Sequence, residues 1–165
     1  MSRTVRHVCI VLAGAALLAP ASALAQVRDV EMKAAYIYNF AQFTTWTEQR
    51  ARQPFRVCAD AGSAIWPSLE AYNGKPVNGR GWSTVDAAVP SDRAPCDLLI
   101  LARSAGSANA APGMLVVRDG AGRGPAMITL VDDDERLRFD VDTREAEKSG
   151  LRFSSKLLRL ARTVL

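Results

Sequence analysis

The hydrophobic residues recur with two different periods along the chain, and the two periods predict a mixture of helices and strands. A helical period runs from Val30 to about Thr44, preceded by Asp29 as a plausible N-cap. Its apolar positions form two adjacent stripes, which predicts a broad buried face. The stripes are Ala34, Ile37, Ala41 and Thr44, and Met32, Tyr36, Phe40 and Phe43.

Shorter runs with alternating or wholly apolar residues predict strands. The run Asp97–Ala102 is almost entirely apolar, which is typical of a strand buried on both faces of a sheet. Two further runs flank the acidic stretch Asp132–Glu135 and predict a β-hairpin. The predicted strands are Phe55–Ala59, Trp82–Asp86, Asp97–Ala102, Met114–Arg118, Met127–Val131 and Leu137–Val141.

Three further helices are predicted, at 64–72, at 144–149 and after residue 154, and the small residues of 104–112 predict a flexible stretch. Thr143 is the predicted cap of the second helix and Ser154 the predicted cap of the last. In the last helix, Leu157, Ala161 and Val164 share one predicted face. The elements together predict one α/β domain over residues 26–165. Its mixed, mostly parallel central sheet is flanked by helices and followed by a C-terminal β-hairpin plus helix.

The first 25 residues have the pattern of a secretory signal peptide. A basic start with Arg3 and Arg6 precedes the apolar run Val8–Leu18, and Ala23-Leu24-Ala25 is a small-x-small cleavage signal. We therefore expect a signal peptide over residues 1–25, a mature chain that begins at Gln26, and a periplasmic location. No later segment is long, apolar and free of charge, so no membrane insertion is expected after cleavage. An uncleaved N-terminal anchor is the alternative.

Cleavage would change the chemistry that the chain has available. The only histidine, His7, would be lost, which excludes Ser-His-Asp and Cys-His catalysis and a histidine metal site. The formal net charge would fall from +4 to +2 because Arg3 and Arg6 are lost. The remaining basic residues are scattered, so no nucleic-acid partner is expected. The glycines of 120–124 and the acids of 132–135 match neither a dinucleotide loop nor an EF-hand, and no catalytic residue, metal or cofactor is predicted.

Cys58 and Cys96 would be the two cysteines of the exported chain, since Cys9 lies in the predicted signal peptide. Cysteines in an oxidising compartment tend to pair, which predicts a disulfide between them. Cys58 lies toward the end of one predicted strand and Cys96 at the start of another, so in adjacent parallel strands they would be offset. A favourable stagger or a frayed strand end is needed. Two free thiols are the alternative.

Three blocks of sequence resemble the YfiR family in order and spacing. The first is Ala35–Trp46, with the letters AYIYNFAQFTTW. The second pairs Phe55–Cys58 with Cys96–Ile100, and the third pairs Leu137–Asp142 with Ser149–Ala161. The resemblance covers essentially the whole chain after the predicted signal peptide.

The resemblance implies a periplasmic α/β domain that tends to dimerise and has a regulatory role. The best-understood members bind the periplasmic part of a membrane diguanylate cyclase and hold it inactive, which lowers cyclic-di-GMP and restrains biofilm formation. The central cysteine pair of the family falls on Cys58 and Cys96. A second, C-terminal disulfide of some members has no cysteines here. The usual Asn falls at Asp142, and Gly124-Pro125-Ala126 replaces a more glycine-rich segment.

Three classes of function therefore remain. The first is a regulator that binds a membrane cyclase, with the C-terminal hairpin and the helices after it as the candidate surface. Lys156, Arg159 and Arg162 there form either a solvated helix face or a partner contact. The second is a small-molecule binding module that feeds a membrane sensor, with a crevice at the carboxyl ends of the strands. The third is an enzyme that uses Asp140 and Asp142, which alternate along a predicted strand; two exposed strand acids are the simpler interpretation.

Overall fold

The computed structural model describes residues 21–46, 54–88, 95–102, 111–122, 124–134 and 136–165. Most of the predicted signal peptide, and most of the stretch 104–112 that the sequence predicts to be flexible, lies outside these residues. The helices are α1 (Ala21–Gln42), α2 (Trp66–Glu70), α3 (Thr143–Lys148) and α4 (Ser155–Leu160). The strands are β1 (Thr44–Trp46), β2 (Phe55–Ala59), β3 (Pro76–Val77), β4 (Arg80–Asp86), β5 (Leu98–Leu101), β6 (Leu115–Asp119), β7 (Ile128–Asp133), β8 (Arg136–Val141), β9 (Leu151–Phe153) and β10 (Thr163–Val164).

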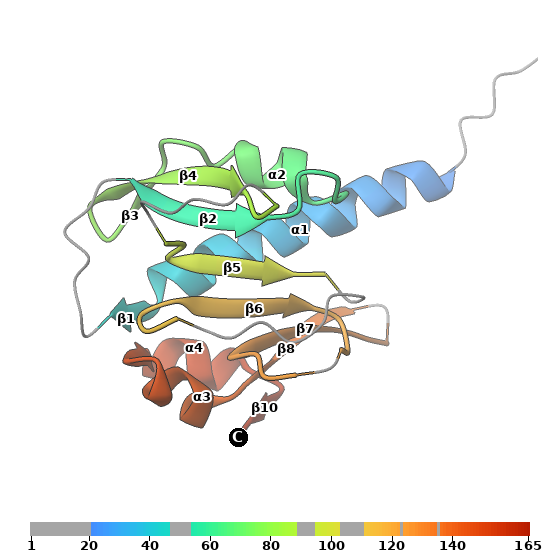
Figure 1. Cartoon of the computed structure of the whole chain (residues 1–165). Coiled ribbons are helices and arrows are strands. Elements are labelled where there is room, and N and C mark those ends of the chain that lie inside the picture. The colour runs from blue at the N-terminus through green and yellow to red at the C-terminus, as the bar shows by residue number, and fades with distance from the viewer. Residues whose placement is uncertain (1–20, 47–53, 89–94, 103–110, 123, 135) are drawn as a thin grey trace, which may run out of the picture.

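The protein has the mixed α/β architecture that the sequence predicts (Figure 1). One eight-stranded sheet has the order β10-β8-β7-β6-β5-β2-β4-β3, and β1 and β9 form a separate antiparallel pair. Neighbours from β4 through β2, β5 and β6 to β7 are parallel, as are β8 and β10, whereas β3–β4 and β7–β8 are antiparallel. The predicted flanking by helices is only partly matched, because α1 is the long helix that crosses one face of the sheet and α2, α3 and α4 have 5, 6 and 6 residues.

Helix α1 begins earlier than predicted, at Ala21, because the alanine-rich sequence before Val30 contains no glycine or proline after Pro20. Asp29 is therefore inside the helix, and its prediction as the N-cap is wrong. Its carboxylate lies 2.9 Å from the ammonium group of Lys33, which also lies 3.2 Å from Asp119 at the end of β6. Burial lowers the pKa of Lys33, but the hydrogen bonds and charges of the two carboxylates outweigh it and raise that pKa above its ordinary value. The buried lysine thus ties α1 to the sheet.

The β3–β4 hairpin is a feature that the sequence prediction missed, since β4 begins at Arg80 and not at Trp82. Its turn residues Asn78 and Gly79 have φ angles of 49° and 80°. Two consecutive positive φ angles are the requirement of the tight hairpin turn that Asn-Gly favours. The hairpin brings Arg80 to the start of β5, as described below.

The C-terminal segment differs from its prediction at the cap of α3 and at the end of α4. The cap of α3 is Asp142 and not Thr143, because its Oδ1 accepts hydrogen bonds of 3.0 Å from the backbone N–H groups of Arg144 and Glu145. Ser154 caps α4 as predicted. The helix ends at Leu160, after which β10 pairs with β8, so the predicted helix face with Val164 is wrong. The β-branched pair Thr163-Val164 fits a strand better than a helix.

Candidate functional site: a groove between α1, β8 and α4

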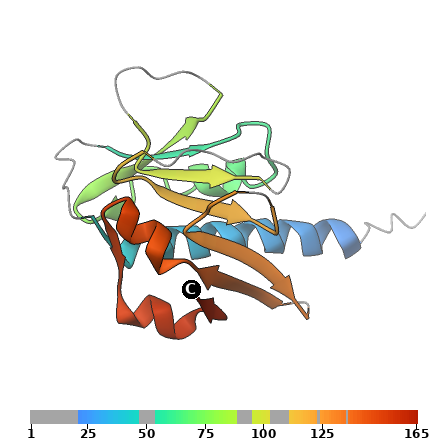
Figure 2. The same ribbon diagram turned by 60° about the horizontal axis from the view of Figure 1, so that its bottom comes forward.

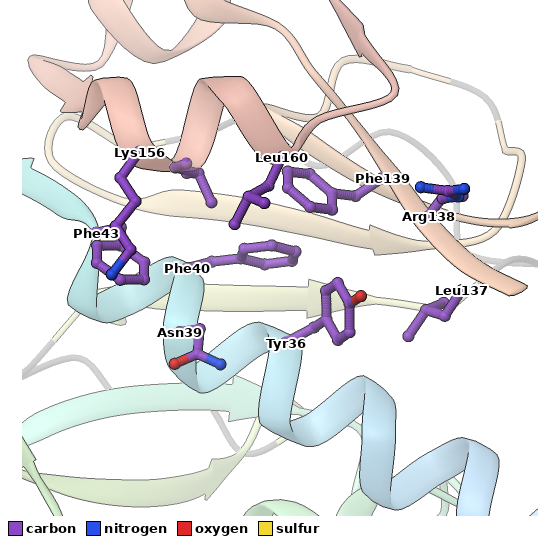
Figure 3. Close-up of a pocket in the computed structure, with 10 residues that line it drawn as sticks. Tyr36, Asn39, Phe40, Phe43, Leu137, Arg138, Phe139, Lys156 and Leu160 are labelled. Atoms are coloured by element: carbon purple, nitrogen blue, oxygen red, sulfur yellow. The ribbon is translucent and has the colours of Figure 1, made fainter.

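A groove of about 520 Å³ lies between α1, β8 and α4 (Figure 3). Helix α4 forms one wall and α1 the other, and side chains of β8 lie between them. The groove does not lie at the carboxyl ends of the parallel strands, where the sequence analysis expected a small-molecule crevice. The lining residues are Tyr36, Asn39, Phe40, Phe43, Leu137, Arg138, Phe139, Lys156, Leu157 and Leu160.

Three aromatic rings form the centre of the groove. The ring centroids of Phe40 and Phe139 are 4.8 Å apart, and Tyr36 meets each of them edge-on at 6.0 Å. Phe40 and Phe139 are buried against the core, while Tyr36 is half-buried. The helical period of α1 brings Tyr36 and Phe40 to one face, and the period of two along β8 turns Phe139 toward them. Rings packed edge-to-face hold one another in place, so this apolar surface is preformed.

Basic side chains border the aromatic centre. The Lys156 ammonium lies 5.0 Å from the centroid of the Phe43 ring, a cation–π contact across the groove. Arg138 is exposed at the other end, and Leu160 is 61 % exposed at the wall. The lining residues include no Asp or Glu. An apolar group that carries negative charge therefore complements this groove best.

Asp140 and Asp142, which the sequence analysis considered as a catalytic pair, have different structural roles. Asp140 accepts two hydrogen bonds from Arg162, of 2.9 and 2.6 Å. These hydrogen bonds hold the pKa of Asp140 below its ordinary value, so the group stays ionised at neutral pH and is a poor proton donor. Asp142 follows the end of β8 and caps α3. The prediction that both acids share a strand face is therefore wrong.

Cys58 and Cys96 form a disulfide, and their Cα atoms lie 5.9 Å apart. Cys58 lies in β2 and pairs in register with Leu99 of β5. Cys96 precedes the first residue of β5, Leu98, so the chain bends before the strand begins and the predicted offset is removed. The sequence analysis required a favourable stagger or a frayed strand end, and the structure meets this requirement by placing Cys96 just outside β5.

A buried ion pair lies directly beside the disulfide. Both terminal nitrogens of Arg80 donate to the two carboxylate oxygens of Asp97, at 2.9 and 2.6 Å, and the backbone N–H of Arg56 donates to Oδ2 at 2.8 Å. The Asp97 side chain is 2 % exposed and that of Arg80 is 17 % exposed. This pair connects the start of β4 to the start of β5, next to Cys96, and its role is structural.

The described residues form neither a metal site nor a membrane-spanning helix. In the described ranges no three His, Cys, Asp or Glu side chains come together as a metal site would require. Among the helices of the same ranges, none is both long and apolar enough to cross a membrane.

The chain belongs to the YfiR/HmsC-like family, whose profile matches residues 30–162. The match covers α1 from Val30 onward, the strands β1 to β9 and the helices of the C-terminal segment, and therefore every residue that lines the groove. A comparison with curated proteins gives no match. The family resemblance inferred from the three sequence blocks is thus confirmed.

The groove itself was not identified from the sequence. Its parts were visible as the Tyr36–Phe40–Phe43 stripe, the alternation in β8 and the cap at Ser154. What brings them together is the β1–β9 pair, in which Thr44 pairs with Phe153 and so fixes α4 beside the end of α1. Neither of those three-residue strands was predicted, so the contact between the two helices could not be inferred.

Proposed function

We propose that this protein is a periplasmic regulator that binds the periplasmic part of a membrane diguanylate cyclase and holds the cyclase inactive. The observation that carries the proposal is the family membership over residues 30–162. The proposal assigns the chain no catalytic step. It includes removal of residues 1–25 as a signal peptide and, from the family resemblance, a homodimer.

The groove supports the proposal as the surface that meets the cyclase. Interaction surfaces commonly place aromatic anchors at the centre and polar groups at the border. The half-buried ring of Tyr36 is the aromatic side chain that a partner can contact, and the buried rings of Phe40 and Phe139 support it from below. Lys156 and Arg138 form a cationic border. The groove lies partly on the C-terminal hairpin and α4, which the sequence analysis favoured, and partly on α1.

A second candidate function is the binding of a small molecule that controls a membrane sensor. The groove volume of about 520 Å³ lies within the range of small-molecule sites, about 300–1,000 Å³. The preformed aromatic centre and the neighbouring Lys156 fit an aromatic anion. The two candidates are distinguished by experiment. Only the small-molecule candidate predicts that a metabolite extract of the host stabilises the isolated chain when no membrane protein is present.

The cyclase proposal is tested by capture of the partner from detergent-solubilised membranes of the native host. We expect the tagged, exported chain to retain a diguanylate cyclase, and its intact mass to correspond to a start at Gln26. The variant Leu160→Glu should lower capture more than tenfold, because a carboxylate is introduced into an apolar wall that meets the partner. Leu160 is 61 % exposed, so the substitution leaves the core intact.

The matched control is Met32→Glu on α1, which replaces an apolar side chain that is 46 % exposed and does not line the groove. We expect this variant to capture the cyclase as the unchanged chain does. Equal losses of cyclase capture in Leu160→Glu and Met32→Glu would show that the groove is not the contact surface. A captured set without any cyclase would contradict the proposed partner.

A further inference from the structure

A second hollow, of about 490 Å³, lies between the first half of α1 and α2, and it shares no lining residue with the groove described above. Figure 1 and Figure 2 both show that α1 extends past the carboxyl ends of β5 and β6. Every residue of this α1–α2 hollow follows residue 25, so removal of the predicted signal peptide would leave its walls in place. The lining residues are Val27, Val30, Glu31, Ala64, Pro67, Ser68, Ala71, Tyr72 and Lys75.

The α2 side of the hollow is fixed by the surrounding fold. The Tyr72 ring packs against Tyr38 of α1, with ring centroids 4.7 Å apart. The backbone N–H of Lys75 donates to the Tyr72 carbonyl at 2.8 Å, and the Lys75 carbonyl accepts a 2.8 Å hydrogen bond from the N–H of Trp82. The Lys75 ammonium lies 4.1 Å from the centroid of the Tyr72 ring. The folded structure therefore sets the position of this cation.

The α1–α2 hollow carries one charge of each sign, on opposite walls. Glu31 belongs to α1, Lys75 follows α2, and both are exposed. Within the ranges that the structure describes, neither side chain forms an ion pair. The other charged residues of the two helices do not line the hollow: Arg28, Asp29, Lys33 and Glu70. The two charges are thus open to a partner that presents a cation to Glu31 and an anion to Lys75.

We propose that the α1–α2 hollow is the contact surface between two copies of this chain that are related by a twofold axis. A twofold interface uses the same surface of both copies, so that surface must complement itself. Glu31 of one copy meets Lys75 of the other, and the twofold axis forms this pair twice. The apolar side chains between the two charges are buried against those of the second copy. The proposal rests on the homodimer in the proposed function and assigns that dimer its surface.

The balance of charge favours a second copy over a partner whose contact surface has a single sign. An anionic surface would face Glu31 and a cationic surface would face Lys75, and like charges brought together in an interface lower its affinity. A second copy of the chain supplies both signs in the required arrangement. The dimer also uses none of the residues that line the groove between α1, β8 and α4. Dimerisation and cyclase binding are therefore assigned to different surfaces of the protein.

The test is sedimentation equilibrium of the full exported chain and its charge-reversal variants over a range of concentrations. We expect the unchanged chain to dimerise. Glu31→Lys and Lys75→Glu should each raise the dissociation constant about tenfold or more, because each brings like charges together twice in the dimer. An equal mixture of the two variants should dimerise as the unchanged chain does, since both opposite-charge pairs re-form between the different chains. Restoration by mixing would also show that the single variants are folded.

The matched controls are Glu147→Lys on α3 and Arg159→Glu on α4, which reverse the charge of exposed side chains outside the hollow. They should leave the dissociation constant unchanged. Equal losses in these controls, or a mixture of Glu31→Lys and Lys75→Glu that does not dimerise, would overturn the proposal.

Two further outcomes separate this interface from the rest of the proposed function. An unchanged chain that stays monomeric at every concentration would overturn the homodimer together with its surface, while capture of the cyclase from detergent would still test the proposed partner. A dimer of unchanged affinity in Glu31→Lys and Lys75→Glu would overturn the surface alone. If these variants then failed to capture the cyclase, the hollow would be a contact with the cyclase instead.

Discussion

Replacing Asp97 by alanine is expected to lower the free energy of unfolding by about 3 kcal/mol or more, because it breaks a buried ion pair and leaves its partner uncompensated. Arg80 would keep its hydrogen bond to the Pro54 carbonyl but lose both contacts with the carboxylate. The backbone N–H of Arg56 would lose its acceptor as well. Urea denaturation of the exported chain measures the change, and the thermal midpoint should fall by about 2–4 °C for each kcal/mol.

A double-mutant cycle separates the pair from other effects of the substitution. The double variant Arg80→Ala/Asp97→Ala should cost less than the sum of the two single variants, since it leaves no unpaired charge. Glu70→Ala, which removes an exposed carboxylate on α2, should change stability by no more than about 0.5 kcal/mol. If the losses of stability in Arg80→Ala and Asp97→Ala add up in the double variant, the contact between these two side chains contributes little to stability.

Removing the disulfide with Cys58→Ala/Cys96→Ala is expected to lower the free energy of unfolding by up to about 4 kcal/mol. The chain-entropy treatment gives this value for a crosslink that joins residues 38 positions apart, and measured losses are often smaller. The crosslink restricts the unfolded chain, so the loss should also be produced in the unchanged protein by a reductant. Denaturation with and without reductant measures it.

The control for the disulfide is the Ala/Ala variant itself, whose stability should not respond to reductant. Thiol labelling of the denatured, unreduced protein should find no free thiol at Cys58 or Cys96. Labelling at both positions would show that the exported protein carries two free cysteines and that the structural pairing does not form.

The sequence predicted the elements whose periodicity is strong and local. The buried face of α1, the strands β2, β5, β6, β7 and β8, and the cap at Ser154 follow from such patterns. Elements of two or three residues were missed, because so short a segment has no period to detect. The strands β1, β3, β9 and β10 form only where tertiary contacts support them. The Asn78-Gly79 turn was the one local signal for β3 that could have been used.

The cap of α3 shows how a residue role can be misjudged. Asp142 was grouped with Asp140 because the two alternate along a predicted strand, whereas β8 ends at Val141 and frees Asp142 to cap the helix. Asn and Asp cap helices about equally well. The Asn that the family resemblance places here and the Asp of this chain can therefore serve the same structural purpose.

The central claim is that the protein restrains a membrane diguanylate cyclase, and the measurement that tests it most directly is cyclic-di-GMP in a strain of the native host without this gene. We expect the nucleotide level to rise on deletion. The unchanged gene and the Met32→Glu control should restore the original level, whereas Leu160→Glu should fail although the variant protein is folded and exported. A deletion strain with an unchanged cyclic-di-GMP level would contradict the account and favour the small-molecule function of the groove.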